Sequence, residues 1–123
     1  MSMFKKDQGK LGEDAAVVYL QKQGIKVIDR NFRIRGGEVD IIGLEGDILV
    51  FFEVKTRASS KFGTPLEAIT YWKLKALIKT AQFYKLKHPH LPDAMRIDAV
   101  SILIENGVIS SIRLDRNISE MYT

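Results

Sequence analysis

Two pairs of ionisable residues stand close together in the sequence, and their types suit chemistry on a phosphate. Glu38 and Asp40 are separated by one residue, and beyond a turn that contains glycine Glu53 and Lys55 are spaced in the same way. Because side chains alternate between the faces of a strand, each pair lies on one face of its own strand. Carboxylates gathered on adjacent strands would bind a divalent cation.

The neighbours of these pairs are apolar, which makes a set of isolated charges expensive. Ile41-Ile42 follows the first pair, and the run from Ile48 to Phe52 reads as a strand covered on both faces. A cation that neutralises the acids is the simplest way to lower the cost of burying them. The chain has no cysteine, so its metal ligands would be oxygens or the two histidines, which favours Mg²⁺ or Mn²⁺.

Hydrolysis of a phosphodiester needs a cation on the phosphoryl oxygen, an activated water and positive charge where negative charge develops. We expect Asp40 and Glu53 to be direct metal ligands, and Glu38 to add a ligand or hold a water. Lys55 would stay charged, because nearby carboxylates raise the pKa of an amine, and would position the water and the phosphate. Glu13 follows a helical stripe into the same apolar layer and would reach the metal or a water.

A simpler alternative is that Glu38 and Asp40 face solvent from an antiparallel sheet, while Glu53 and Lys55 pair as surface neighbours. Either pair alone would carry almost no information. Their combination across one hairpin, inside apolar strands, favours a shared polar site.

Hydrophobic periodicity and turn residues predict the elements that would position this site. In chain order they are a helix from Gln8 to Gln23, extended segments Ile25 to Ile28 and Asn31 to Arg35, strands beginning at Glu38 and near Ile48, a helix from Pro65 to about Lys87, and strands Met95 to Ile104 and Val108 to Leu114. Gly36-Gly37 and Asn106-Gly107 are hairpin signals. The order predicts one α/β domain over residues 1–123, with a mixed sheet and a polar, frayed tail over 115–123.

The net charge of +4 and the pI near 9.4 favour a polyanionic partner, and nucleic acid is the first to consider. The residues expected to contact it are Arg33, Arg35, Arg57, Lys61, Trp72, Lys75 and Lys79. An exposed tryptophan among amines would stack on unpaired bases. Two alternatives remain open: the arginines blunt a solvated edge strand, or Trp72 caps the core. Asp98 is interpreted as a structural partner for an arginine.

No apolar stretch approaches the roughly 18 to 20 residues that span a bilayer, and the first ten residues lack the apolar centre of a secretion signal. We therefore expect a cytoplasmic protein with no membrane partner.

Several motifs together resemble the PD-(D/E)xK nuclease superfamily and, within it, the YraN-like family of bacterial proteins. The resemblance covers roughly residues 8–104 and is carried by Gly12-Glu13, Asn31-Phe32-Arg33, Gly37 to Ile42, Val50 to Arg57, Phe62 to Ala68 and Arg96-Ile97-Asp98. It implies a restriction-endonuclease-like, three-layer fold similar to archaeal Holliday-junction resolvases. Their first-helix glutamate, strand aspartate and Glu-x-Lys pair correspond here to Glu13, Asp40, Glu53 and Lys55. Val39 stands where the superfamily pattern has proline.

The leading hypothesis is thus a Mg²⁺- or Mn²⁺-dependent endonuclease acting on DNA, with a preference for structured or branched forms that the resolvase resemblance implies. The same resemblance implies a homodimer. A competing hypothesis is a binding module of the same fold that holds nucleic acid without cutting it. A third is a metal-dependent hydrolase of a small phosphate ester.

Overall fold

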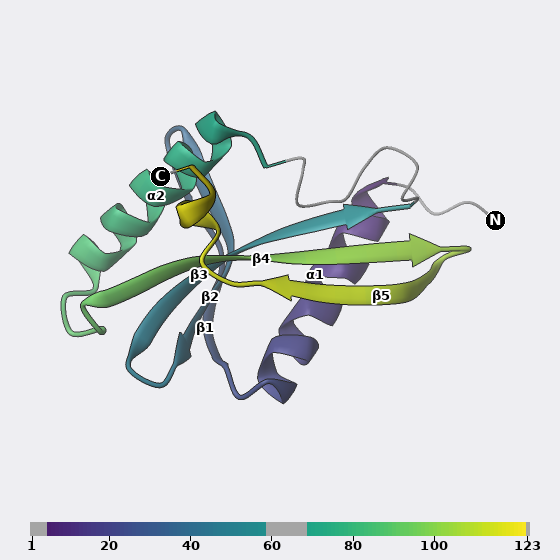
Figure 1. The fold of residues 1–123 in the computed structure, drawn as a ribbon, viewed down its shortest axis with the longest axis horizontal. Helices are drawn as coiled ribbons and strands as arrows, with labels where there is room; N and C mark the ends of the chain where they lie inside the picture. Colours follow the sequence, from purple (N-terminus) through teal and green to yellow (C-terminus); the bar gives the residue numbers. More distant parts are fainter. Residues whose placement is uncertain (1–4, 59–68, 123) are drawn as a thin grey trace.

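The computed structural model describes residues 5–58 and 69–122, with side chains over 8–58 and 69–120. The elements, in chain order, are α1 (Lys5–Lys22), β1 (Lys26–Ile34), β2 (Gly37–Glu45), β3 (Ile48–Arg57), α2 (Tyr71–Lys87), β4 (Ala94–Glu105), β5 (Val108–Asp115) and the 3₁₀ helix η2 (Ile118–Tyr122). The five strands form one sheet in sequential order, β1-β2-β3-β4-β5 (Figure 1).

The sheet is mixed, because β3 and β4 run parallel while the other neighbouring strands are antiparallel. Parallel neighbours need a long crossover, and α2 lies in the connection between β3 and β4. The predicted fold class, α/β with a mixed central sheet flanked by helices, is confirmed.

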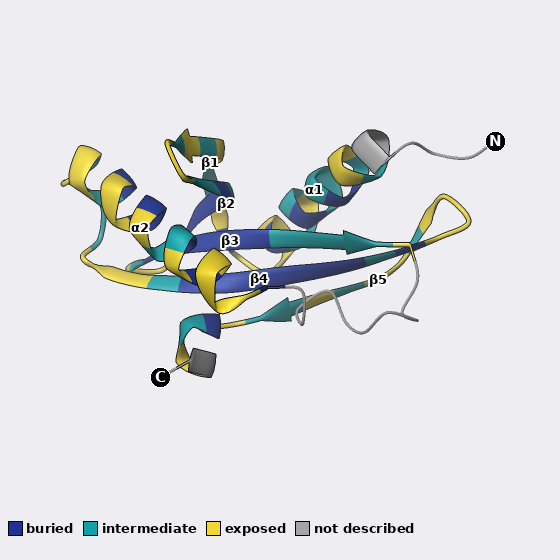
Figure 2. Cartoon of the chain, turned by 90° about the horizontal axis from the view of Figure 1, so that it is seen from above, coloured by how far each residue is buried: buried dark blue, intermediate teal, exposed yellow. Residues whose placement is uncertain are grey.

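Two apolar clusters hold the layers together, one on each face of the sheet. Phe51 belongs to the cluster that packs α2, and Phe52, its neighbour on β3, belongs to the cluster that packs α1. Figure 2 shows β2 running between the two helices, with β3 and β4 buried over much of their length. Burial on both faces explains why the sequence of β3 is an apolar run rather than an alternating pattern.

The turns follow the glycine and asparagine signals closely. Asn106 and Gly107 have φ of 54° and 76° between β4 and β5, as the hairpin signal predicts. α1 ends before Gly24, whose φ is 87°, and the Ile25 N–H donates to the Leu20 carbonyl at 3.0 Å, which closes the helix end.

The structure corrects two predicted strand boundaries. The segments Ile25 to Ile28 and Asn31 to Arg35 form one strand, β1, which has a register shift between Val27 and Asp29. Asn31 has a φ of 54°, so the strand changes direction there without ending. The turn that follows consists of Arg35 and Gly36, and Gly37 is already the first residue of β2.

The predicted helix from Pro65 begins later, at Tyr71. Thr70 is its N-cap, because its backbone is extended and its side chain accepts the Lys73 N–H at 3.1 Å. Ile69 and Thr70 are not helical, and Pro65 lies outside the described residues.

The frayed tail expected over 115–123 is also corrected. η2 forms in this segment, and Ile118 is buried in the cluster that packs α2. The segment is thus anchored by Ile118 in this cluster and by the hydrogen bond from the Asn117 N–H to Asp98.

Candidate active site

β2 and β3 separate at the point where their acidic residues meet. Their ladder runs from Glu45 opposite Ile48 to Ile41 opposite Phe52, and the same register continued by one residue sets Asp40 opposite Glu53. Beyond the ladder, the Asp40 side chain of β2 accepts a hydrogen bond from the Val54 N–H of β3, with a distance of 2.8 Å to Oδ2. Both residues line the same cavity and the charge of Glu53 acts on the Asp40 carboxyl group, so the two carboxylates are neighbours.

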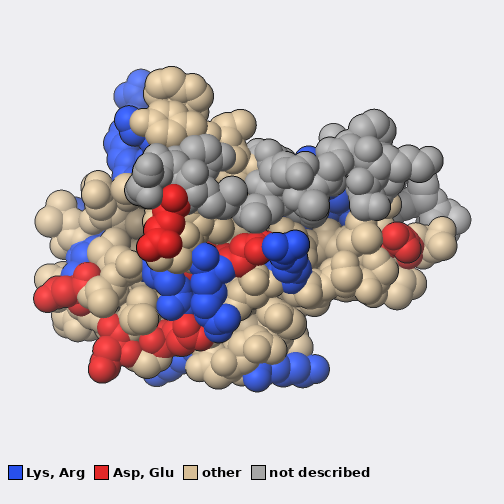
Figure 3. Space-filling model, in the orientation of Figure 1, with Lys and Arg blue, Asp and Glu red and all other residues tan. Residues whose placement is uncertain are grey.

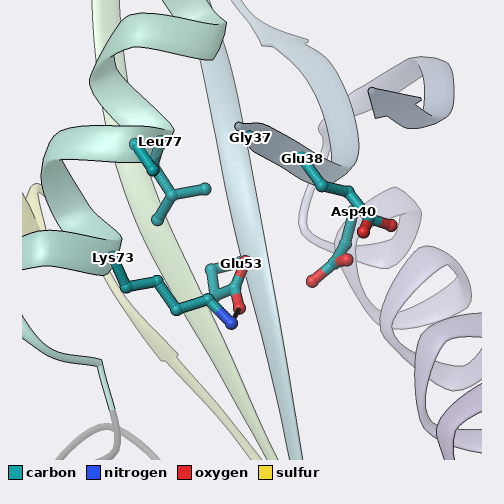
Figure 4. Close-up of a pocket in the computed structure, with 7 residues that line it drawn as sticks. Gly37, Glu38, Asp40, Glu53, Lys73 and Leu77 are labelled. Atoms are coloured by element: carbon teal, nitrogen blue, oxygen red, sulfur yellow. Dashed lines mark ion pairs between the residues drawn. The ribbon is translucent and has the colours of Figure 1, made fainter. Parts of the chain in front are cut away.

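These carboxylates line a cavity of about 170 Å³ between the strands and α2. Its wall consists of Gly37, Glu38, Asp40, Glu53, Lys73, Ala76 and Leu77. In Figure 4 the Asp40 side chain extends from β2 toward β3, and Lys73 reaches from α2 to the Glu53 carboxylate. Glu38, Asp40 and Glu53, which the sequence predicted to gather, thus share one cavity.

Asp40 carries the strongest electrostatic signature of the site. Burial and the charge of Glu53 raise the pKa of Asp40 to about 7, against the Val54 hydrogen bond, which lowers it. Glu38 and Glu13 add smaller contributions in the same direction. A carboxyl group whose neighbours are negative gains most from a cation placed beside it.

Glu53 is held by two ammonium groups. Its Oε1 lies 2.7 Å from Lys73 Nζ and 3.4 Å from Lys55 Nζ, and its side chain is only 5% exposed. Burial lowers the pKa of Lys73, but the hydrogen bonds with Glu53 and Lys55 outweigh that effect and raise it.

Lys55 behaves differently from the sequence prediction, which had nearby carboxylates raising its pKa. Burial and the neighbouring Lys73 lower the pKa of Lys55, and they outweigh the opposing effect of Glu53. The prediction counted the acids around Lys55 and left out the burial of its amine and the second amine, Lys73, beside it. Lys55 is therefore closer to releasing its proton than an ordinary lysine.

Lys73 is the residue that sequence reasoning missed. It lies in the helical stripe Lys73, Leu77, Thr80, Tyr84, whose other members are all buried. A lysine on an apolar stripe signals a buried acidic partner. The ridge of Trp72, Lys75 and Lys79 lies on a different face of the same helix, and the sequence prediction rested on that exposed face.

Glu13 lies near the site but is held by other partners. Its Oε1 accepts from Arg30 Nε and Nη2 at 3.1 and 3.0 Å and from Asn31 Nδ2 at 3.0 Å. Glu13 is not among the residues that line the cavity, although its charge contributes to the raised pKa of Asp40. Gly12 allows this close approach of α1, because a Cβ there would lie 2.3 Å from Thr56 Oγ1.

None of the described residues expected to contact nucleic acid is part of the cavity wall, and they come from different elements. Arg33 is exposed and lies 3.3 Å from Glu38 through its Nε, and Arg35 occupies the adjoining turn. β1 is an edge strand, so the edge-strand interpretation of these arginines remains open. Arg57 is the partly exposed last residue of β3, and Lys61 lies outside the described residues.

The first turns of α2 carry an aromatic and basic surface on the other side of the cavity. Trp72 is 75% exposed, which excludes the alternative that it caps the core. Lys75 Nζ lies 6.0 Å from the Trp72 ring centroid and 5.1 Å from that of Tyr71, and Lys79 is exposed farther along the helix. On the face shown in Figure 3, basic and acidic side chains lie beside one another, so any contact with a polyanion must be local.

Asp98 has the structural role predicted for it. Its carboxylate accepts from Arg96 Nε at 2.8 Å and from the Asn117 N–H at 2.9 Å, and the side chain is fully buried. Arg96 also reaches Glu45 at 2.7 Å. This network ties β4 to the end of β2 and to the segment before η2.

The chemistry of the donor set fits Mg²⁺ or Mn²⁺. Over residues 8–58 and 69–120, no three histidine or acidic side chains are arranged to hold a metal ion by themselves. Mg²⁺ does not need such a cage, since it keeps several waters and is held by one or two carboxylates together with substrate phosphates. Asp40 and Glu53 are two such oxygen donors on one cavity wall.

Among the described residues, none of the helices has the length and apolar character needed to cross a bilayer.

Comparison with known proteins identifies the relatives of this chain. A family model described as "Uncharacterised protein family UPF0102" matches residues 12–102. The UPF0102 protein of Leifsonia xyli is 48% identical over 103 residues, which cover 82% of this chain and 86% of that protein. The protein of Persephonella marina is 43% identical over 104 residues, 85% of this chain and 90% of its own. The UPF0102 protein of Clostridium kluyveri is 40% identical over 115 residues, which cover 93% of this chain and 94% of that protein. The chain therefore belongs to the UPF0102 family, the YraN-like family that its motifs resemble.

Proposed function

We propose that the protein is a Mg²⁺- or Mn²⁺-dependent endonuclease that hydrolyses phosphodiester bonds in DNA. The observation that carries this proposal is the meeting of Asp40 and Glu53 on one cavity wall with Lys55 beside them. The resemblance to PD-(D/E)xK nucleases supports the reaction type. The resemblance to Holliday-junction resolvases supports a preference for structured or branched DNA.

Each residue of the site has a distinct role in the proposal. Asp40 and Glu53 hold the cation, which when bound polarises the phosphoryl oxygen and lowers the barrier to attack by water. Lys55 orients the attacking water and the scissile phosphate, and because its pKa is lowered a larger fraction of its amine is neutral, the form that a base needs, than in an ordinary lysine. Glu38 orients water at the cavity mouth, and Glu13 strengthens the negative potential that attracts the cation.

The surfaces on the two sides of the cavity would hold the DNA strand. Trp72 stacks on a base, while Lys75 and Lys79 contact backbone phosphates. On the other side, Arg33 and Arg35 of the β1–β2 hairpin and Arg57 at the end of β3 supply further phosphate contacts, with Lys61 as an additional candidate. In this proposal the protein acts in the cytoplasm, and a symmetric homodimer would present one cavity to each of two strands.

A binding module without cleavage is the second candidate, and one observation favours it. Lys73 already neutralises Glu53 at 2.7 Å, so the site can be satisfied without a metal ion. In this alternative the protein would hold branched or single-stranded DNA for replication, repair or recombination partners.

Incubation with labelled DNA distinguishes the two candidates. Wild type, Asp40→Asn, Lys55→Ala and the control Glu105→Gln, whose side chain is exposed at the end of β4, would be mixed with duplex, single-stranded, flap and four-way DNA in Mg²⁺ or Mn²⁺. The endonuclease proposal predicts cleavage by wild type and the control only, with rates at least 100-fold lower in the two site variants. DNA binding by all four proteins without any cleavage would instead support the binding module.

A further inference from the structure

We propose that Lys73 is an exchangeable counter-ion: its ammonium group occupies the place of the cation on Glu53, and cation binding releases Lys73 to contact a phosphate of the substrate. This inference rests on the proposed function of the same site. It deepens that proposal by assigning a role to a residue that the motif does not contain.

The first step of the argument is the electrostatic need of Glu53. A carboxylate that is 5% exposed requires a positive partner, and Lys73 Nζ at 2.7 Å is nearer than Lys55 Nζ at 3.4 Å. Lys73 comes from α2, whereas Lys55 is fixed two residues from Glu53 on the same strand. The closer and more adaptable partner is therefore the one that a metal ion would have to replace.

The second step is that the helix itself does not favour a lysine at this position. Lys73 lies in the first turn of α2, where the aligned peptide dipoles disfavour a cation, and this turn contains no acidic residue. Its ion pair with Glu53 is the interaction that holds the side chain over the cavity. When a dication occupies the carboxylates, that interaction becomes repulsive.

The third step is that Lys73 has somewhere to go. Its side chain is 42% exposed, compared with 24% for Lys55, so it can leave Glu53 without crossing the core. Together with Ala76 and Leu77 it lines the α2 side of the cavity, facing Asp40 across it. A phosphate in the cavity would lie within reach of this long and flexible ammonium side chain.

Titration with Mn²⁺ tests the exchange directly. Binding would be followed by electron paramagnetic resonance for wild type, Lys73→Met, Lys73→Arg and the control Lys87→Met, an exposed lysine at the far end of the same helix. Removal of the competing ammonium predicts about tenfold tighter Mn²⁺ binding by Lys73→Met, and no tightening by Lys73→Arg or the control. Circular dichroism would confirm that each variant is folded before titration.

The outcomes separate this inference from the function on which it rests. Equal Mn²⁺ affinity in wild type and Lys73→Met, or weaker binding in the variant, would overturn the exchange but not the proposed metal site. Absence of Mn²⁺ binding in every protein would overturn the proposed metal-dependent function and the exchange with it. Binding by Lys73→Met alone would support the exchange in its strongest form.

DNA affinity tests the second half of the inference. With Ca²⁺, which takes the same oxygen ligands, Lys73→Met should bind single-stranded DNA more weakly than wild type. The slope of log affinity against log salt concentration should be about one unit shallower, because one phosphate contact is lost. Without a dication the two proteins should bind DNA alike, because Lys73 is then engaged by Glu53. An equal loss under both conditions would overturn the released phosphate contact.

Discussion

Asp40 is subject to two opposing influences, and their balance makes it the most sensitive residue of the site. The Val54 N–H stabilises its charged form, whereas burial and the charge of Glu53 favour the protonated form and win, with a pKa of about 7. A carboxyl group poised near neutral pH is a sensor for any added positive charge.

Asp40→Asn should stabilise the protein at high pH. Between about pH 4 and 7 the folded state keeps a proton that the unfolded chain has lost, so the contribution of Asp40 to stability falls as pH rises and is smallest above pH 7. We expect the melting temperature of Asp40→Asn to exceed that of wild type by roughly 5–10 °C at pH 8, equivalent to about 2 kcal/mol, with little difference at pH 4. Thermal unfolding followed by circular dichroism measures both, with Glu105→Gln as the control. A variant less stable than wild type at pH 8 would contradict the assigned electrostatics.

Mn²⁺ affinity should depend on pH through the same group. The metal needs the deprotonated carboxylate, so affinity should be nearly constant above pH 7 and fall by up to about tenfold per unit below it. Calorimetric titrations at pH 8, 7, 6 and 5.5 would trace this curve. Affinity that is unchanged between pH 8 and 5.5 would show that Asp40 is not a ligand.

At the scale of elements, Gly12 and Gly37 set how closely the helices approach β2 and β3. A Cβ on Gly12 of α1 would lie 2.3 Å from Thr56 Oγ1, and one on Gly37 of β2 would lie 2.0 Å from Thr80 Oγ1. Gly9, one turn before Gly12 on α1, has no atom within 4 Å of the same position. Gly9 is therefore a matched control for Gly12, because both lie on α1 and only Gly12 is closely packed against β3.

Gly12→Ala should destabilise the protein although alanine favours helices. To relieve the clash, the Thr56 side chain must rotate or α1 must move away from β3. We therefore expect the free energy of unfolding to fall by about 1–2 kcal/mol in Gly12→Ala and to rise by up to about 0.5 kcal/mol in Gly9→Ala. Chemical denaturation of both variants gives the comparison. If Gly12→Ala gained as much as Gly9→Ala, the close packing of α1 on β3 would be wrong.

Local rules predicted the elements well and the long-range pairings poorly. Apolar runs, Gly24 and Asn106-Gly107 placed α1, the strands and the last hairpin, because turn and cap chemistry depends on adjacent residues. The burial of Ile118 was missed because it depends on what the segment packs against. The start of α2 at Tyr71 was missed although its N-cap, Thr70, is a local signal. The lowered pKa of Lys55 also depends on the tertiary structure, because it results from burial of the amine and from Lys73, which reaches it from another element.

At the scale of the whole molecule, the cavity lies between an arginine-bearing hairpin and an aromatic helix end. Its acids come from β2 and β3, while the surrounding basic residues come from β1, the β1–β2 turn, the end of β3 and α2. In the proposed function, a DNA strand that crossed the cavity would meet arginines on one side and Trp72 on the other.

Trp72→Ala should weaken binding of single-stranded DNA. Loss of the stacked indole should cost about 1–3 kcal/mol of binding free energy, which lowers the affinity roughly fivefold or more. The slope of log affinity against log salt concentration should stay the same, because no charge is removed. Leu86→Ala is the matched control, since Leu86 is also 75% exposed on α2. Fluorescence anisotropy at several salt concentrations measures both quantities. Equal affinities in the two variants would remove Trp72 from the binding surface.

The central claim is that Asp40 and Glu53 form one cation site, and the anomalous scattering of Mn²⁺ in a soaked crystal tests it most directly. We predict a single strong peak within about 2.0–2.3 Å of a carboxylate oxygen from each residue, with Lys73 Nζ displaced from Glu53. A crystal that takes up Mn²⁺ elsewhere, or that keeps the Glu53–Lys73 ion pair and shows no peak between β2 and β3, would contradict the account.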